Sequence, residues 1–208
     1  MITCIAGDPG GGKSLYSIWL MNELAKVGKK VATNIELRPA HPSYKKIFRI
    51  GTESHPILGE DRAFWNYFPR DKRGFSYMNY FIDEADIDLD ATEWKDMAKP
   101  VRLYFKQHRK YKDNIWLITQ NPNWLYNRVR DLVREFVWCD HDDYTSPGLG
   151  RALKYIIPQS MMRYRRRSFR DIKMTPSTLV RTGHFTNAEA EELYNWYYTE
   201  QIIGQSEF

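Results

Sequence analysis

The chain has 208 residues, of which 42% are hydrophobic and 15% aromatic, so its composition excludes a disordered protein and predicts a single domain with a core. No apolar run approaches the roughly 20 residues that a membrane-spanning helix needs, and the N-terminus lacks the pattern of a signal peptide. The net charge of +5 is unevenly distributed. Residues 151–181 hold nine Lys or Arg against one Asp, whereas residues 183–208 hold five Glu and no Lys or Arg. A surface that meets a polyanion is therefore expected in the last third of the chain.

The first 140 residues alternate between strand and helix patterns. Short runs rich in β-branched and aromatic residues predict strands at 3–6, 29–35, 77–83, 114–119 and 135–140. Helical spacing of apolar residues predicts helices at 15–27, 101–111 and 124–133, with Pro100 suited to a first turn. Residues 38–76, with four prolines, are expected to be irregular apart from a strand near 46–50. This alternation predicts an α/β fold with a mostly parallel central sheet flanked by helices.

The pattern changes after the turn-like residues 146–150. Residues 152–174 favour a β-ribbon with a basic end, and residues 187–201 form an acidic helical pattern with Thr186 or Asn187 as its cap. We therefore predict one core at 1–145, with a C-terminal ribbon and helix at 146–208 appended to the same domain.

The two cysteines, Cys4 and Cys139, both lie in apolar runs with strand character. We interpret them as packing residues of a protein from a reducing compartment.

A glycine-rich loop lies between the first predicted strand and the first predicted helix. It matches the phosphate-binding pattern G-x-x-x-x-G-K-[ST], and its expected nucleotide-binding residues are Gly7, Asp8, Pro9, Gly10, Gly11, Gly12, Lys13, Ser14 and Leu15. Glycines let the backbone wrap a polyphosphate, and the positive helix N-terminus attracts the same charge. In such a loop Lys13 would reach the β- and γ-phosphates and Ser14 would bind Mg²⁺. The sequence therefore predicts a P-loop NTPase with ATP and Mg²⁺ as its ligands.

An acidic pair, Asp83 and Glu84, ends the apolar strand at 77–83. With a phosphate loop in the same chain, Asp83 is expected to help anchor Mg²⁺ and Glu84 to orient or deprotonate an attacking water. The alternative is that the pair only caps a helix. Asp86, Asp88 and Asp90 are interpreted as a solvated acidic loop.

Gln120 ends the strand at 114–119, and ligands of open α/β sheets collect at such strand ends. We expect Gln120 to sense the γ-phosphate or hold the water. Arg109 is the first candidate for an arginine finger delivered to a neighbouring subunit, ahead of Arg128 and Arg130. No His or Cys group has metal-ligand spacing, so Mg²⁺ carried with the nucleotide is the only ion predicted.

Residues 163–170 interleave arginines with aromatic residues, which suits phosphate contact and base stacking. The candidate nucleic-acid residues are Arg163, Arg165, Arg166, Arg167 and Arg170. A solvated ribbon face, a contact between subunits and a contact with anionic lipid remain alternatives.

Five segments in order, at 2–14, 29–35, 80–86, 108–122 and 129–139, resemble the zonula occludens toxin (Zot) family, which includes the assembly ATPases of filamentous phages. That family belongs to the FtsK–HerA group of DNA-pumping and viral DNA-packaging ATPases, with a RecA-like fold. The resemblance covers about residues 1–140, and the His-Arg pair followed by the I-T-Q strand is its most specific part. By this resemblance Lys13 and Ser14 match the nucleotide loop, Asp83 and Glu84 the acidic strand end, Gln120 the polar sensor, and Arg109 the His-Arg pair.

The resemblance implies a homo-oligomeric ATPase, such as a hexameric ring, that works with DNA and with viral capsid or assembly proteins. It implies the cytoplasm of an infected host cell, the virion vertex or the cytoplasmic face of the inner membrane as its place. Filamentous-phage members usually carry a transmembrane segment after the ATPase domain, and these 208 residues contain none. The sequence is therefore either a piece of such a protein or a short packaging ATPase.

Together, the motifs and the resemblance predict a viral ATPase that couples ATP hydrolysis to DNA translocation, in genome packaging or in phage export. The main alternative is a membrane-associated assembly scaffold whose ATPase does not handle DNA. A small-molecule kinase would share the phosphate loop but would need a lid and an acceptor pocket, and a helicase reading of the D-E-A-D letters lacks further helicase elements.

Overall fold

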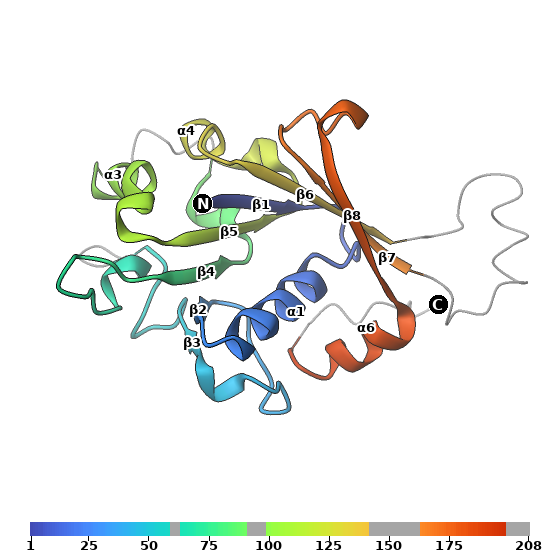
Figure 1. The fold of residues 1–208 in the computed structure, drawn as a ribbon, viewed down its shortest axis with the longest axis horizontal. Helices are drawn as coiled ribbons and strands as arrows, with labels where there is room; N and C mark the ends of the chain where they lie inside the picture. Colours follow the sequence, from blue (N-terminus) through green and yellow to red (C-terminus); the bar gives the residue numbers. More distant parts are fainter. Residues whose placement is uncertain (59–62, 91–98, 142–162, 199–208) are drawn as a thin grey trace, which may run out of the picture.

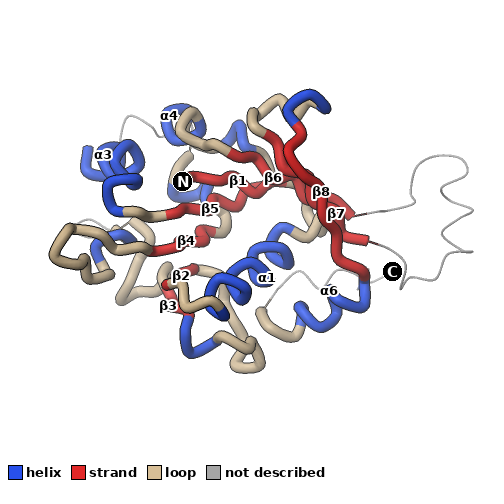
Figure 2. Tube along the Cα trace, in the orientation of Figure 1, coloured by secondary structure: helices blue, strands red, loops and turns tan. Residues whose placement is uncertain are grey.

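The computed structural model describes residues 1–58, 63–90, 99–141 and 163–198, which form an α/β fold around one eight-stranded sheet (Figures 1 and 2). The strands are β1 (Ile2–Ala6), β2 (Lys30–Thr33), β3 (Ile47–Arg49), β4 (Met78–Ile82), β5 (Asn114–Thr119), β6 (Glu135–His141), β7 (Arg163–Phe169) and β8 (Leu179–Thr186). The α-helices are α1 (Lys13–Lys26), α2 (Ala85–Asp88), α3 (Lys99–Gln107), α4 (Asn127–Arg130) and α6 (Asn187–Tyr194). Short 3₁₀ turns are η1 (Tyr44–Lys46), η2 (Phe64–Asn66), η3 (His108–Tyr111), η4 (Pro122–Trp124) and η6 (Pro176–Thr178).

The strand order is β3-β2-β4-β5-β1-β6-β7-β8, and every pairing from β3 to β6 is parallel. Strands β7 and β8 continue the same sheet as antiparallel neighbours of β6. The predicted fold class is confirmed: a mostly parallel sheet with helices, a C-terminal ribbon and a C-terminal helix. The boundary expected at 145/146 lies outside the described residues, as does most of the ribbon's first half, so the division into a core and an appendage stays a prediction.

Two apolar layers cover the two faces of the sheet. On one face α1 and α6 pack side by side over Ile5 and Ile118, as the blue and red-orange helices of Figure 1 show. On the other face α3 and α4 cover Ile2 and Leu117 with the help of η2. Successive residues of a strand point to opposite faces, so the mainly apolar β1 and β5 are buried on both sides, as central parallel strands are. Cys4 and Cys139 are buried free thiols in these layers, as predicted.

Local sequence explains where the helices begin and end. Helix α1 places Leu15, Ile18 and Met21 on its buried face and stops before Gly28, whose φ of 73° closes the helix end. Helix α6 starts with a capping box, because Thr186 accepts from the amide of Glu189 and the Glu189 carboxylate accepts from the amide of Thr186. Thr186 is thus the cap that the sequence suggested.

Two predicted helices are shorter than expected. The helix expected at 124–133 is confined to α4, because Leu125 bridges to Asp90 and the amide of Tyr126 donates to the Leu89 carbonyl at 2.7 Å. These contacts hold residues 125–126 extended, so the helix begins at Asn127. The helix expected at 101–111 starts earlier and ends at Gln107, after which η3 tightens the chain towards Lys112, whose φ is 61°.

The chain after α6 folds back onto residues 36–38. The amide of Arg38 donates to the Trp196 carbonyl at 2.8 Å, and the amide of Tyr198 donates to the Glu36 carbonyl at 2.9 Å. Beside this contact the buried ring of His41 meets Trp196 edge to face, with 5.3 Å between ring centroids. The acidic helical pattern predicted to residue 201 therefore ends at Tyr194, because the following backbone pairs with another segment.

The buried His41 should make this docking contact sensitive to acid. Burial lowers the pKa of His41 to about 4, from an ordinary value of 6.5. Between these values the unfolded chain binds a proton that the folded chain does not, so we expect the free energy of unfolding to fall as the pH falls from 6.5 to 4. In His41→Gln this pH dependence should be shallower, measured by urea unfolding at several pH values. A His184→Gln control, at an exposed position, should keep the original slope, and parallel slopes for His41→Gln and the unmodified chain would contradict the expectation.

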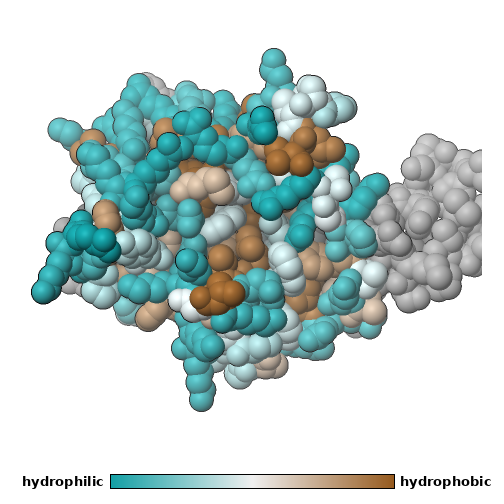
Figure 3. Space-filling model, in the orientation of Figure 1, coloured by the Kyte–Doolittle hydropathy of each residue, from teal (hydrophilic) through white to brown (hydrophobic). Residues whose placement is uncertain are grey.

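Within the described ranges no helix has both the length and the apolar character needed to cross a membrane. The face seen in Figure 3 is largely hydrophilic, with hydrophobic side chains in scattered patches.

Candidate active site

A cavity of about 740 Å³ lies where the carboxyl ends of β1, β2, β4 and β5 meet the start of α1. A volume of this size is typical of small-ligand sites. Its lining residues are Pro9, Gly10, Gly12, Lys13, Ser14, Leu15, Asn34, Ile35, Glu36, Asp83, Glu84, Asp86, Ile87, Thr119, Gln120, Tyr194, Tyr197 and Tyr198. The loop, the acidic strand end and Gln120, which were expected to form the site, are thus brought together.

The glycine loop packs closely against β6 and β7. Gly7 has a φ of 151°, and a Cβ there would lie 2.0 Å from the Cys139 carbonyl oxygen on the neighbouring strand. Gly12 has a φ of 88°, and a Cβ there would lie 2.7 Å from the Tyr164 ring on β7. Only glycine suits such positions, so the loop keeps its backbone bare and close to its neighbours. This cradle fits a phosphate chain, which backbone amides can surround.

Lys13 and Ser14 open helix α1 at the floor of the cavity. The Lys13 ammonium donates to the carbonyls of Gly7 and Asp8, each at 2.9 Å. Burial lowers the pKa of Lys13, and the nearby Asp83 carboxylate opposes that shift. The lysine is thus held across the loop, at the positive end of a helix where an anion would be stabilised.

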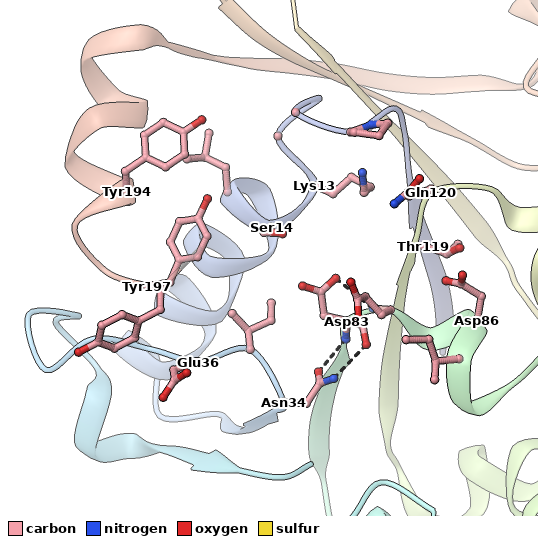
Figure 4. A pocket seen from close by; sticks show the side chains of 18 residues that line it. Lys13, Ser14, Asn34, Glu36, Asp83, Asp86, Thr119, Gln120, Tyr194 and Tyr197 are labelled. Carbon is pink, nitrogen blue, oxygen red and sulfur yellow. Dashed lines mark hydrogen bonds between the residues drawn. The ribbon is translucent and has the colours of Figure 1, made fainter. Parts of the chain in front are cut away.

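Asp83 is a carboxyl group of the cavity lining with a raised pKa. Burial raises its pKa to about 6, against the hydrogen bonds that it accepts from the Glu84 amide and the Ser14 hydroxyl. The side-chain amide of Asn34 clamps its backbone, accepting from the Asp83 amide at 2.7 Å and donating to the Asp83 carbonyl at 2.9 Å (Figure 4). A hydroxyl and a carboxylate side by side are oxygen ligands of the kind that Mg²⁺ takes together with phosphates, so the donor set fits this ion. The described residues contain no group of three or more His, Cys, Asp or Glu side chains that could hold a metal by themselves.

Glu84 follows Asp83 in a left-handed backbone conformation, with φ 50° and ψ 42°. Such a conformation is rare for a residue with a Cβ and tends to occur at functional sites. It turns the chain into α2 and leaves the Glu84 side chain exposed at the cavity. A solvated carboxylate beside the phosphate loop can accept a proton from water.

Thr119 ends β5 and Gln120 follows it, on the side of the cavity that holds Asp83 (Figure 4). The amide of Asn121 donates to the Thr119 hydroxyl at 3.3 Å, which turns the chain after the strand. The Gln120 side chain is exposed and points towards Lys13 in this view.

Several cavity residues were not anticipated from the sequence. Asn34 and Glu36 follow β2, and their position at the carboxyl end of the strand predicted at 29–35 was the available signal. Asp86 lines the cavity from α2, whereas the sequence predicts a solvated acidic loop at this position. Tyr194, Tyr197 and Tyr198 come from the far end of the chain, where no pattern points to a nucleotide.

The candidate arginine fingers lie outside this cavity in the same chain. Arg109 is in η3, before the start of β5, and its charge acts on the amino group of Met1 at the start of β1. It is therefore at the amino edge of the sheet, opposite the phosphate loop. Arg128 and Arg130 are in α4 and are likewise absent from the described lining.

The basic strand β7 divides its arginines between two faces. Arg165 and Arg167 both pair with Asp140 on β6, at 3.4 Å and 2.7 Å. Arg166 points the other way and lies over the rings of Tyr16 and Trp19 on α1, at 4.7 Å and 4.6 Å from their centroids. Arg163 is the first residue of the strand. Arg170 follows the strand and is exposed. The five arginines that the sequence grouped together thus do not share one surface, because strand residues alternate in direction.

The family model for zonular occludens toxin (Zot) matches residues 1–155, about three quarters of the 208 residues. The chain belongs to the Zot family. Curated relatives include the gene 1 proteins of Enterobacteria phages M13 and f1, each 24% identical over 97% of this chain. The chain spans only 60% of the length of these relatives.

Solved structures with the same fold include the N-terminal domain of a Zot family member. That domain, from Neisseria meningitidis, matches with a TM-score of 0.58 and 18% identity, covering 95% of this chain and 98% of that one. The genome packaging NTPase B204 of Sulfolobus turreted icosahedral virus 2, in complex with AMPPCP, matches with a TM-score of 0.51 and 12% identity over 89% and 96%. B204 of Sulfolobus turreted icosahedral virus, described as a DNA-packaging ATPase, matches with a TM-score of 0.50 and 14% identity over 87% and 95%. At these identities the likeness establishes the fold.

Proposed function

We propose that this chain is a Mg²⁺-dependent ATPase that couples hydrolysis to DNA movement during virion assembly. The observation that carries the proposal is the convergence of the phosphate loop, an acidic strand end and a polar strand end on one cavity. Membership of the Zot family and the gene 1 proteins among the relatives support a role in phage assembly. The nucleotide complexes of B204 and its description as a packaging ATPase agree with this direction.

Each side chain has a proposed task. The amides of the loop and Lys13 bind the phosphates. Ser14 and Asp83 offer oxygen ligands to the magnesium ion, which when bound would neutralise charge that develops on the phosphates. Glu84 orients the attacking water and accepts its proton, and Gln120 contacts the γ-phosphate. Arg109 lies at the opposite edge of the sheet, so it can act only in a neighbouring subunit, which makes an oligomer such as a ring part of the proposal.

The DNA part of the proposal rests on the face of β7 that points away from α1 and carries Arg165 and Arg167. Arg165 and Arg167 remain 51% and 41% exposed although both pair with Asp140. Exposed ion pairs are weak, so phosphate groups can compete with Asp140 for these guanidinium groups. Contacts of this kind carry little sequence preference, which suits a protein that moves DNA. Arg166, packed on α1, has no part in this surface.

The direct test is the steady-state ATPase rate with and without single- or double-stranded DNA. We expect DNA to raise the rate, and the double variant Arg165→Ala/Arg167→Ala to lose most of that increase while keeping the basal rate. Arg49→Ala, a half-exposed arginine on β3 at the other edge of the sheet, is the matched control and should respond to DNA normally.

Two outcomes would change the proposal. Hydrolysis that is indifferent to DNA would favour the assembly scaffold, and membranes and coat or capsid proteins would be tested next. If the purified chain does not hydrolyse ATP, or if Lys13→Ala leaves the observed rate unchanged, then the ATPase proposal itself is wrong.

A further inference from the structure

The cavity has two chemically different ends. Asp83, Thr119 and Gln120 lie on one side of Ser14 in Figure 4, and Tyr194 and Tyr197 lie on the other. Tyr198 also lines the cavity and is 51% exposed, whereas the Tyr197 side chain is only 6% exposed. One end therefore offers oxygen atoms and a cation, and the other offers aromatic rings.

The aromatic end is fixed in place before any ligand arrives. Tyr197 bridges to Leu37, and the amides of Arg38 and Tyr198 complete an antiparallel contact between residues 36–38 and 196–198. The rings of Tyr194 and Tyr197 stack with centroids 6.0 Å apart, and the hydroxyl of Tyr194 lies 2.7 Å from that of Tyr164 on β7. An aromatic surface held this firmly loses little conformational entropy when it binds a flat ligand.

Tyr198 contributes a half-exposed aromatic side chain to this arrangement. The Arg38 guanidinium lies over its ring at 4.9 Å from the centroid, which occupies one face. Tyr198 lines the cavity and is 51% exposed, so a planar partner in the cavity would stack on the face opposite Arg38. A cation on one face and a base on the other is a favourable stack, since both interact with the π-electrons of the ring.

The position of the phosphate loop decides which part of a nucleotide reaches these rings. If Lys13 and the acidic end take the terminal phosphates, then the nucleoside must extend past Ser14 and Leu15, towards the tyrosines. We propose that Tyr198, at the same end of the cavity as Tyr194 and Tyr197, is the nucleobase subsite. This inference rests on the proposed nucleotide-binding function. Stacking needs only a flat ring, so the subsite recognises a nucleobase as a class.

The test compares ATP with ribose 5-triphosphate, which keeps the sugar and phosphates but lacks the base. Dissociation constants of both Mg²⁺ complexes are measured by calorimetry on the full chain. Loss of one stacked base costs about five- to a hundredfold in affinity, so the unmodified chain should bind ATP more tightly by a factor in that range. Tyr198→Ala should lose most of this preference while its affinity for ribose 5-triphosphate stays the same, and Tyr198→Phe should keep it. Tyr44→Ala, which removes an exposed tyrosine from η1 outside the cavity, is the matched control.

The outcomes separate this inference from the function on which it rests. Equal affinities for ATP and ribose 5-triphosphate in the unmodified chain would overturn the subsite but leave phosphate binding standing. Equal losses for both ligands in Tyr198→Ala would also overturn it, because a structural role affects the whole cavity. If neither ligand binds, or if Lys13→Ala binds both as well as the unmodified chain, then the nucleotide site itself is wrong.

Discussion

Replacing Glu84 by glutamine is expected to slow ATP hydrolysis by about a hundredfold or more while leaving ATP binding nearly unchanged. Glutamine keeps the shape of the side chain but cannot accept a proton, and general-base groups typically contribute 10²- to 10⁴-fold to a rate. Among the described residues, no hydrogen bond or ion pair joins the Glu84 side chain to the phosphate loop, so affinity should survive. The two measurements are single-turnover hydrolysis and equilibrium binding of ATP with Mg²⁺.

Asp88→Asn provides the matched control for this change. It converts a carboxylate to an amide at the end of α2, the short helix that Glu84 precedes, and it lies outside the described lining of the cavity. Its hydrolysis rate should stay within a few-fold of the unmodified chain. A Glu84→Gln chain that hydrolyses ATP at the normal rate would assign the base to another group, with Asp86 as the next carboxylate in the cavity.

The second large effect is on stability: Gly7→Ala should lower the free energy of unfolding by about 2–5 kcal/mol. The new Cβ would lie 2.0 Å from the backbone oxygen of Cys139, which cannot rotate away as a side chain could. This clash can be relieved only if β1 and β6, which pair at the centre of the sheet, separate locally. Urea unfolding followed by circular dichroism measures the change.

Gly28→Ala isolates the contribution of the close contact. Gly28 also has a positive φ, of 73°, but a Cβ there would meet nothing within 4 Å. Gly28→Ala should lower the free energy of unfolding by about 1 kcal/mol, because only the backbone conformation is unfavourable for alanine. If the two variants unfold at the same urea concentration, the contact between the loop and β6 is looser than the structure indicates.

The sequence predicted those features that depend on neighbouring residues. The phosphate loop was recognisable because its glycines, Lys13 and Ser14 are contiguous and lie between a strand and a helix. Asp83, Glu84 and Gln120 each follow a strongly apolar strand, and parallel strands place their carboxyl ends along one edge of a sheet. The alternation of patterns was therefore sufficient to predict both the fold class and the group of residues that meet in the cavity.

The features that sequence reasoning missed depend on contacts between distant segments. Nothing near Asn34 indicates that its side chain clamps the backbone of Asp83, 49 residues away. Tyr197 and Tyr198 reach the cavity only because their backbone pairs with residues 36–38. The shortened helix α4 has the same cause, since Leu89 and Asp90 hold residues 125–126 extended. Strand alternation could have predicted that the β7 arginines point to two faces. It could not have predicted that Arg166 packs on Tyr16 and Trp19 of α1.

The contact between β7 and the glycine loop has a consequence for how this protein can be dissected. The family match ends at residue 155, which makes a truncated chain at that point an obvious choice for a minimal catalytic fragment. Such a fragment would remove the Tyr164 ring from beside Gly12 and the Arg166 guanidinium from α1, and β6 would become an unpaired edge. We expect the exposed edge of β6 to promote aggregation. We also expect the glycine loop, without its contact to Tyr164, to lose activity. We therefore expect the smallest stable fragment with an intact cavity to extend beyond the family segment to the C-terminal hairpin and helix.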